Sequence, residues 1–248
     1  MSRFSVVIPC YHDEDKLANL LSQLQGLMSP PFEIIVVDGA ADAACRTICR
    51  QYSARWLAGE PCRGRQLLAG AALAKGEALW FLHADNRLAP DPITPMERIF
   101  SLGALGGYFR FRFDIPRAWP AWLLEPAIAV RCRFGVPYGD QGLFMTREAY
   151  FEAGSHSPWP LFEEVSLVHE LRRLGRFLPL REPIFVDPRR WHRDGWWRRT
   201  WVNRNLALAF ARGVSPDRLA ARYRSKLTCP LSRGRPCTKP SSNTMAKH

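Results

Sequence analysis

The chain has 248 residues, 47% of them hydrophobic, which is enough for one α/β domain with a sizeable core. A mean hydropathy of -0.21 argues against a bundle of membrane-spanning helices, and the least polar long stretch, 118–130, is too short and too interrupted to cross a bilayer. The N-terminal region lacks the long apolar run of a secretory signal, so we expect a cytoplasmic protein. Seven cysteines without a CxxC pair agree with reduced thiols in that compartment.

The positive charge is concentrated in the last third of the chain. From Arg172 to the end, 19 lysines and arginines face 4 acids, a balance of +15, whereas the first 171 residues have a balance of -3. A basic region of this kind indicates an anionic partner, such as nucleic acid, an acidic lipid surface or a phosphate-bearing substrate.

Short apolar runs alternate with helical periodicity in the first hundred residues. We predict strands at 4–9, 32–39 and 78–83, and helices at 13–27, about 42–53 and about 63–74. Cys45 and Cys49 lie on the second helix and are interpreted as packing thiols rather than as half of a metal site. This order predicts a parallel sheet with helices on both faces, in which Tyr11, Asp38 and Asp85 line a crevice at the carboxyl ends of the strands.

The second half has a less regular pattern. We predict a strand at 106–113, a helix pair or proline-containing lid at 119–134, a turn at 138–142, a strand at 143–145 and a helix at 161–174. Short strands near Leu178 and Phe185 and helices at 195–211 and 215–223 follow, and the polar segment 225–248 is expected to be a disordered tail. We therefore expect one domain, 1–224, with a nucleotide-binding half at 1–100 and an acceptor half at 101–224.

Four acids fall at positions suited to catalysis: Asp38 and Asp85 at strand ends, and Glu163 and Glu164 at a helix start. A strand-end carboxylate, phosphate oxygens and water together complete a magnesium or manganese shell. That cation and the nearby arginines of 63–66 offset the charge of a diphosphate leaving group. A separate carboxylate takes the proton from an attacking hydroxyl.

Several of these segments resemble glycosyltransferase family 2. Residues 6–14 (VVIPCYHDE) are similar to the family's opening and 34–39 (IIVVDG) to its second strand, and 63–66 (RGRQ), 81–85 (FLHAD), 138–142 (YGDQG) and 161–164 (LFEE) are similar to its donor, metal and acceptor motifs. With PRRW at 188–191, the combination is closest to the bacterial transferase 2 subgroup of the radical-SAM/selenodomain-associated type. The resemblance covers 4–223 and implies an inverting enzyme with the GT-A fold, an α/β architecture with a mixed, mostly parallel central sheet flanked by helices.

The resemblance also implies roles for individual residues. The resemblance implies that the protein transfers a hexosyl group from a nucleoside-diphosphate donor. The residues that it implies for donor binding are Pro9, Tyr11, Asp38, Arg65 and Asp85. Asp85 is also the expected ligand of a divalent cation, manganese or magnesium, and the acceptor-binding residues are Asp140, Gln141 and Trp191. Glu164 is the expected catalytic base, and we expect the helix dipole to keep it ionised.

Two departures from the family pattern concern this site. His83 stands where the family has the first acid of its metal motif, and Glu164 is one methylene longer than the family's aspartate.

Each motif also has a purely structural interpretation. Asp38 precedes Gly39 as a turn residue does, acids are favoured at helix starts, and Arg63 and Arg65 suit a solvated helix start.

The Arg/Trp-rich stretch 189–201 has three interpretations. It could form a partly buried helix, it could make peripheral contact with an anionic membrane or a lipid-linked acceptor at the membrane surface, or it could bind nucleic acid, which we weigh lowest. A nucleotidyltransferase is disfavoured because no glycine-rich loop follows the first strand. The alternative to an enzyme is a basic nucleic-acid- or membrane-binding module on a non-catalytic glycosyltransferase-like scaffold.

Overall fold

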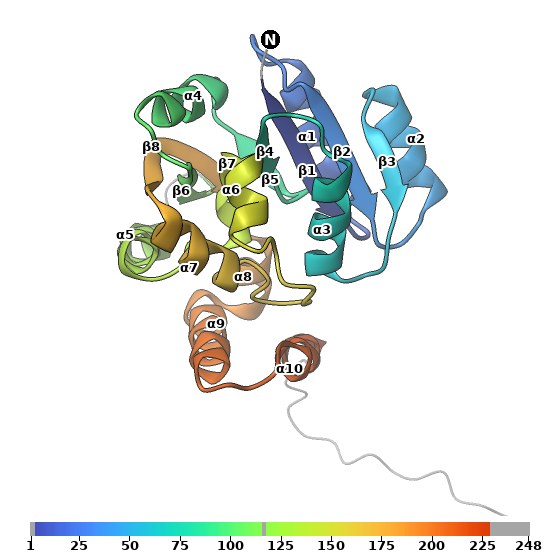
Figure 1. Ribbon diagram of the computed structural model, residues 1–248. Helices are drawn as coiled ribbons and strands as arrows, with labels where there is room; N and C mark the ends of the chain where they lie inside the picture. The colour runs from blue at the N-terminus through green and yellow to red at the C-terminus, as the bar shows by residue number, and fades with distance from the viewer. Residues whose placement is uncertain (1–2, 116–117, 229–248) are drawn as a thin grey trace, which may run out of the picture.

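The computed structural model describes residues 3–115 and 118–228, with side chains as far as Tyr223 (Figure 1). Over these residues one sheet contains eight strands, in the spatial order β3-β2-β1-β4-β7-β6-β8-β5. The strands are β1 (Phe4–Cys10), β2 (Glu33–Asp38), β3 (Arg55–Ala58), β4 (Ala78–Phe81), β5 (Asn86–Leu88), β6 (Gly106–Phe113), β7 (Phe144–Thr146) and β8 (Phe177–Val186). The helices are α1 (Glu14–Gln25), α2 (Ala43–Gln51), α3 (Arg63–Leu73), α4 (Ile93–Ser101), α5 (Trp119–Phe134), the 3-10 turn η1 (Gly139–Gln141), α6 (Arg147–Glu152), α7 (Val165–Leu174), α8 (Arg189–Asp194), α9 (Trp196–Ala211) and α10 (Pro216–Thr228).

The first half of the sheet is parallel and the second half is mixed. Strands β3, β2, β1 and β4 run parallel, β7 is antiparallel to both β4 and β6, and β5 is antiparallel to β8, while β6 and β8 are parallel. The predicted α/β fold with a mostly parallel sheet flanked by helices is therefore confirmed. Because Cys10 is in register with Asp38, the ends of β1 and β2 lie at the same edge of the sheet.

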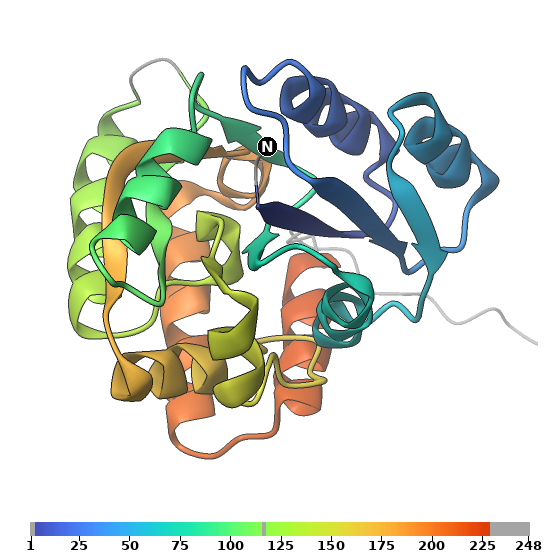
Figure 2. The same ribbon diagram turned by 45° about the horizontal axis from the view of Figure 1, so that its top comes forward.

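Helices cover both faces of the sheet because alternate strand residues point to opposite sides. Val6 and Ile8 pack with α1, α2 and α4, and Val7 packs with α3, α6 and α7. Cys45 and Cys49 are buried in the first of these layers, which confirms the packing interpretation. The C-terminal helices α8, α9 and α10 lie beyond the sheet, at the end where β1 and β4 finish (Figures 1 and 2).

The structure corrects four expected boundaries. Residues 119–134 form one helix, α5. Pro120 lies in its first turn, where proline does not interrupt a helix, and Pro126 is an exposed residue inside the helix. The two expected short strands near Leu178 and Phe185 are one long strand, β8. Helix α7 begins at Val165, four residues later than predicted. Helix α10 continues to Thr228, so the tail that we expected from residue 225 does not begin there. The rest of that expected tail, 229–248, lies outside the described residues.

Candidate active site

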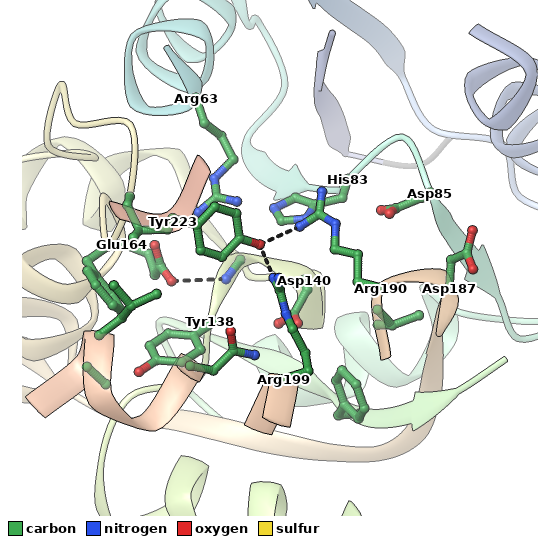
Figure 3. Close-up of a pocket in the computed structure, with 18 of the residues that line it drawn as sticks. Arg63, His83, Asp85, Tyr138, Asp140, Glu164, Asp187, Arg190, Arg199 and Tyr223 are labelled. Atoms are coloured by element: carbon green, nitrogen blue, oxygen red, sulfur yellow. Dashed lines mark hydrogen bonds between the residues drawn. The ribbon is translucent and has the colours of Figure 1, made fainter. Parts of the chain in front are cut away.

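A cavity of about 770 Å³ opens at the carboxyl ends of β1 and β4 and is closed by α5, α8, α9 and α10 (Figure 3). Its walls include six of the residues predicted from the sequence, namely Pro9, Tyr11, Asp85, Asp140, Glu164 and Trp191. Asp85 and Asp187 lie on one side of the cavity and Glu164 on the other, with Arg190, Arg199 and Tyr223 between them (Figure 3). This volume is typical of a small-molecule or nucleotide site.

The N-terminus of α3 packs closely against the segment that precedes α7. The amide of Gly64 donates to the Trp159 carbonyl over 3.0 Å, and a Cβ at Gly64 would lie 2.1 Å from the Ser157 carbonyl oxygen. Arg63 forms a part-buried, bidentate ion pair with the fully buried Glu163, in which Nη2 lies 3.0 Å from Oε2. The start of α3 and the acidic pair of the motif LFEE are therefore one connected unit.

A strained turn presents the two acids at the start of α7. Phe162 has a φ of +62°, a value that aromatic residues rarely adopt, and its ring stacks on Phe210 of α9 at 4.7 Å between centroids. Burial raises the pKa of Glu163, but the Arg63 guanidinium outweighs burial and holds that pKa below the usual range. Glu163 is thus an ionised structural partner of Arg63.

Glu164 has the properties of a proton acceptor. Its Oε1 accepts from the Gly139 amide at 3.3 Å, whereas its buried Oε2 has no hydrogen-bond partner among the described residues and belongs to a side chain that lines the cavity. Burial first, and then the negative charge of Glu163, raise the pKa of Glu164 well above the usual range. Our expectation that the helix dipole keeps this acid ionised is therefore corrected, because desolvation and a like charge dominate.

His83 is a neutral imidazole in the floor of the cavity. Burial and the nearby Arg63 charge lower its pKa to about 3, and its Nε2 is buried without a partner among the described residues. The absence of a side chain at Gly139 makes room for the ring, since a Cβ there would lie 3.0 Å from Nε2. His83 therefore offers the cavity a hydrogen-bonding nitrogen in place of a charge.

Asp85 lies among other charged groups. Its Oδ2 is 3.4 Å from Nη2 of Arg189, whose Nη1 is 2.7 Å from Oδ1 of Asp13. Burial raises the pKa of Asp85, the two arginines Arg189 and Arg190 oppose that rise, and Asp13 adds to it. A half-buried carboxylate with one long ion pair is a group that an added cation would stabilise.

The donor set fits a divalent cation held jointly with substrate. In residues 3–115 and 118–228, no three His, Cys, Asp or Glu side chains are grouped so that they can hold a metal ion by themselves. Magnesium is commonly bound by one or two carboxylates together with phosphate oxygens and water, and manganese prefers the same oxygen ligands. Asp85 can supply such a carboxylate within the cavity.

The residues of the turn 138–142 divide into two groups. Asp140 lines the cavity, its Oδ1 is buried without a hydrogen-bond partner in the described part of the chain, and burial raises its pKa. Gln141 instead points into the protein, where its Oε1 accepts from the Cys132 thiol at 2.9 Å and from the Tyr138 amide at 3.2 Å. The structure supports Asp140 and not Gln141 as a group facing a ligand.

Asp38 and Arg65 lie outside the cavity walls. The carboxylate of Asp38 accepts hydrogen bonds from the amides of Ala40 and Asp42 at 2.9 and 2.8 Å and from Trp56 Nε1 at 3.2 Å, so it stabilises its own turn. Arg65 is exposed and pairs with Glu60. Their predicted contacts with the donor stay predictions. Of the two arginines at the start of α3, Arg63 and not Arg65 lines the cavity.

Sequence reasoning missed three residues at the centre of the cavity. Tyr223 Oη accepts from Nη1 of Arg190 at 2.9 Å and from Nη2 of Arg199, as Figure 3 shows. Arg199 also pairs with Asp194 at 3.2 Å, whereas Arg190 has the phenol as its hydrogen-bonding partner in this group. The two guanidinium groups suit an anion, because a phosphate oxygen is a stronger, charge-assisted acceptor than the phenol oxygen. The arginine pairs of the stretch 189–201 were a signal for this site, but Tyr223 belongs to no motif.

Fold and site together define an α/β protein with a polar cavity at the carboxyl ends of its parallel strands, and the comparison of sequences gives its family. The model of the glycosyl transferase family 2 matches residues 5–154, more than half of the chain. The protein therefore belongs to glycosyl transferase family 2. A search of curated protein sequences found no significant match.

Several solved structures share the fold. TarS of S. aureus has a TM-score of 0.58 at 16% identity over 76% of this chain, which spans 37% of the length of TarS. Residues 1–349 of TarS in complex with UDP-GlcNAc have a TM-score of 0.58 at 15% identity, over 75% of this chain and 58% of that one. Glucosyl-3-phosphoglycerate synthase from Mycobacterium tuberculosis, in complex with Mn2+, UDP and glucosyl-3-phosphoglycerate, has a TM-score of 0.54 at 16% identity, over 73% and 70% of the two chains.

Proposed function

We propose that this protein transfers a hexosyl group from a nucleoside-diphosphate donor to an acceptor hydroxyl, with inversion and with the help of a divalent cation. The observation that carries the proposal is the buried, unpartnered Oε2 of Glu164 in the same cavity as Asp85. Inversion needs a single displacement and hence one base. Glu164 and Asp140 each have a free buried oxygen and a raised pKa, and the resemblance of LFEE to the family's catalytic motif selects Glu164.

The reaction we propose has one proton transfer and one exchange of bonds at the anomeric carbon. Glu164 takes the proton of the acceptor hydroxyl through Oε2, and the acceptor oxygen forms a bond to that carbon as its bond to the donor phosphate breaks. The nucleoside diphosphate leaves with the bonding electrons. Arg190 and Arg199, released from Tyr223, balance the charge that develops on the diphosphate.

Asp85 is the residue that would hold the divalent cation, which would offset the charge of the leaving diphosphate. His83 and Asp140 each direct a buried, unpartnered polar atom into this region, so they suit contacts with sugar hydroxyls or water. UDP is the first nucleotide to test, because the structures of TarS and of the mycobacterial synthase contain UDP-GlcNAc and UDP with Mn2+ respectively. We also propose membership of the radical-SAM-associated transferase 2 subgroup, on the motifs quoted above.

A thermal-shift screen of nucleoside diphosphates and sugar nucleotides, with and without manganese, tests this proposal. A binder at 100 times its Kd adds about 2.7 kcal/mol of apparent stability, which corresponds to an increase in Tm of about 5–10 °C for a domain of this size. We expect UDP with manganese to give such a shift. A screen in which no nucleoside diphosphate changes the Tm would overturn the proposed function.

A further inference from the structure

Helix α5 exposes large apolar side chains on the face that is turned away from the core. Ala121, Leu124 and Cys132 are buried, yet the opposite stripe is apolar as well and consists of Trp119, Trp122, Leu123, Val130 and Phe134. Trp122 is 72% exposed and Phe134 82%. A helix that is apolar on both faces can bury one face in its own protein and the other against a partner. Exposed apolar patches of this kind mark interaction sites.

Helix α9 extends this surface. Its exposed stripe contains Trp197, Trp201 and Leu208, and Trp201 is 63% exposed. The rings of Trp119 and Trp197 lie 5.7 Å apart and join the two stripes at their N-terminal ends. We call the surface formed by these eight side chains the α5–α9 face: Trp119, Trp122, Leu123, Val130, Phe134, Trp197, Trp201 and Leu208.

The charge of the two helices is almost entirely positive. Together α5 and α9 contain five arginines and one acid, Glu125, which is nearly buried and paired with Arg112 at 2.8 Å. Arg133 and Arg204 are exposed on the same helices, and Arg212 follows the end of α9. Tryptophans and leucines beside arginines suit the interfacial layer of a bilayer, where indole rings lie at headgroup depth and guanidinium groups bind anionic headgroups.

The inner faces of the same helices line the proposed active site. Leu124, Ala127 and Ile128 of α5 and Leu206, Ala207 and Leu208 of α9 form an apolar wall of the cavity. Leu208 belongs both to this wall and to the exposed face, so the apolar lining continues to the surface. A ligand with a polar head near Glu164 and an apolar chain along this wall would match the cavity.

We propose that the α5–α9 face docks on the surface of an anionic lipid bilayer, and that the acceptor hydroxyl belongs to an amphiphile held in that bilayer. The docking stands by itself, whereas the statement about the acceptor rests on the proposed function. In the described residues, 3–115 and 118–228, none of the helices meets the length and hydropathy of a membrane span. The contact that we propose is peripheral.

Charge and side-chain chemistry favour a bilayer over the other occupants. A second copy of this chain packed symmetrically on the same face would bring arginines of both copies together, which opposes association. Nucleic acid would stack on the tryptophans, but Leu123, Val130 and Leu208 provide no stacking platform.

Vesicle flotation tests the docking. The full chain is mixed with phosphatidylcholine vesicles with and without phosphatidylglycerol, at low and at high salt. We expect the protein to float with the anionic vesicles at low salt, to be released as salt screens the charges, and to stay in solution with neutral vesicles. Equal flotation with neutral vesicles, or no flotation with either kind, would overturn the proposal.

The matched variants separate this face from general surface hydrophobicity. Trp122→Ser, Leu123→Ser and Phe134→Ser together remove exposed side chains of the α5–α9 face and should weaken vesicle binding about a hundredfold or more. The control, Met28→Ser with Phe32→Ser, removes two apolar side chains between α1 and β2 that are 101% and 55% exposed, and this variant should bind vesicles as the parent does. Unchanged binding of the triple variant would contradict the assignment of the face.

Two further measurements identify a wrong occupant. A dimer of the parent in size-exclusion chromatography that the triple variant lacks would assign the face to a second copy. Retention of a single-stranded oligonucleotide that the triple variant loses would assign it to nucleic acid. The Tm shift produced by UDP with manganese is expected to be the same in the parent and both variants, so failure of the proposed function and failure of the docking are distinguishable.

Discussion

Replacing Glu164 with glutamine separates the chemical step from donor binding. The amide of the variant keeps an oxygen that can accept from the Gly139 amide, and it keeps nearly the same volume, but it cannot take the acceptor proton through the position of Oε2. General base catalysis contributes typically 10²–10⁴-fold, so we expect the transfer rate to fall by about that factor. Donor binding should persist, because it depends on groups on the other side of the cavity, Asp85 and Arg190 among them.

The same substitution has a predictable effect on stability. The pKa of Glu164 is raised in the folded protein, so its contribution to stability is present below the pKa of an unfolded glutamate and is lost as the pH rises through the folded pKa. Glutamine carries no charge at any pH and lacks this loss. The Tm of Glu164→Gln should therefore equal or exceed that of the parent at alkaline pH, which a thermal-shift series over pH will measure.

Two control variants lie on the same segment. Glu163→Gln removes the fully buried partner of an ion pair whose Arg63 side chain is 29% exposed. We therefore expect a lower Tm, with a cost below the figure of about 3–5 kcal/mol for breaking a fully buried pair. Glu170→Gln, on the exposed side of α7, removes a surface pair with Arg173 and should change neither rate nor Tm measurably.

The assay is the release of nucleoside diphosphate in a single turnover, combined with a titration of the donor. Transfer at the parental rate by Glu164→Gln would refute the assignment of the base, and Asp140 would be the next carboxylate to test. A Glu163→Gln variant that keeps its Tm but loses transfer, while Glu164→Gln stays active, would place the base one residue earlier.

Two further predictions concern the metal and the base. Asp85→Ala should abolish the manganese-dependent part of the UDP thermal shift and keep the fold, whereas replacing the exposed Asp15 of α1 with alanine should keep the full shift. An unchanged shift with Asp85→Ala would contradict the metal assignment. Transfer needs ionised Glu164, so kcat/KM should rise with pH along a limb well above the usual pKa of a glutamate, and a limb at the ordinary value would show that desolvation does not control this base.

The amino-acid sequence determined the parallel half of the fold because its signals are local. Runs such as 6–9 and 34–37 are short, apolar and β-branched, and helical periodicity separates them, so the order of strand and helix follows from neighbouring residues. The position of Asp85 at a strand end was found in the same way, whereas the resemblance to glycosyltransferase family 2 singled out Glu164 and the turn at Asp140. The core around β1, with Val6 and Val7 on opposite faces, follows from the alternation of side chains along a strand.

Only the tertiary structure decided which polar side chains face the cavity and what each of them contacts. Arg63 and Arg65 are two residues apart, yet the close approach at Gly64 turns Arg63 to the buried Glu163 and leaves Arg65 in solvent. The place of Tyr223 depends on the packing of α10 on α9, a contact between elements that no short motif encodes.

The raised pKa of Glu164 is likewise a property of the assembled protein. The sequence places an acid at a helix start, where the dipole alone would favour the charged form. Burial and the charge of Glu163 act through space and exceed that local effect. Propensities, periodicity and motifs describe interactions between near neighbours in the chain, whereas desolvation and ion pairing depend on every element that packs around the group, so they emerge only when the chain is folded.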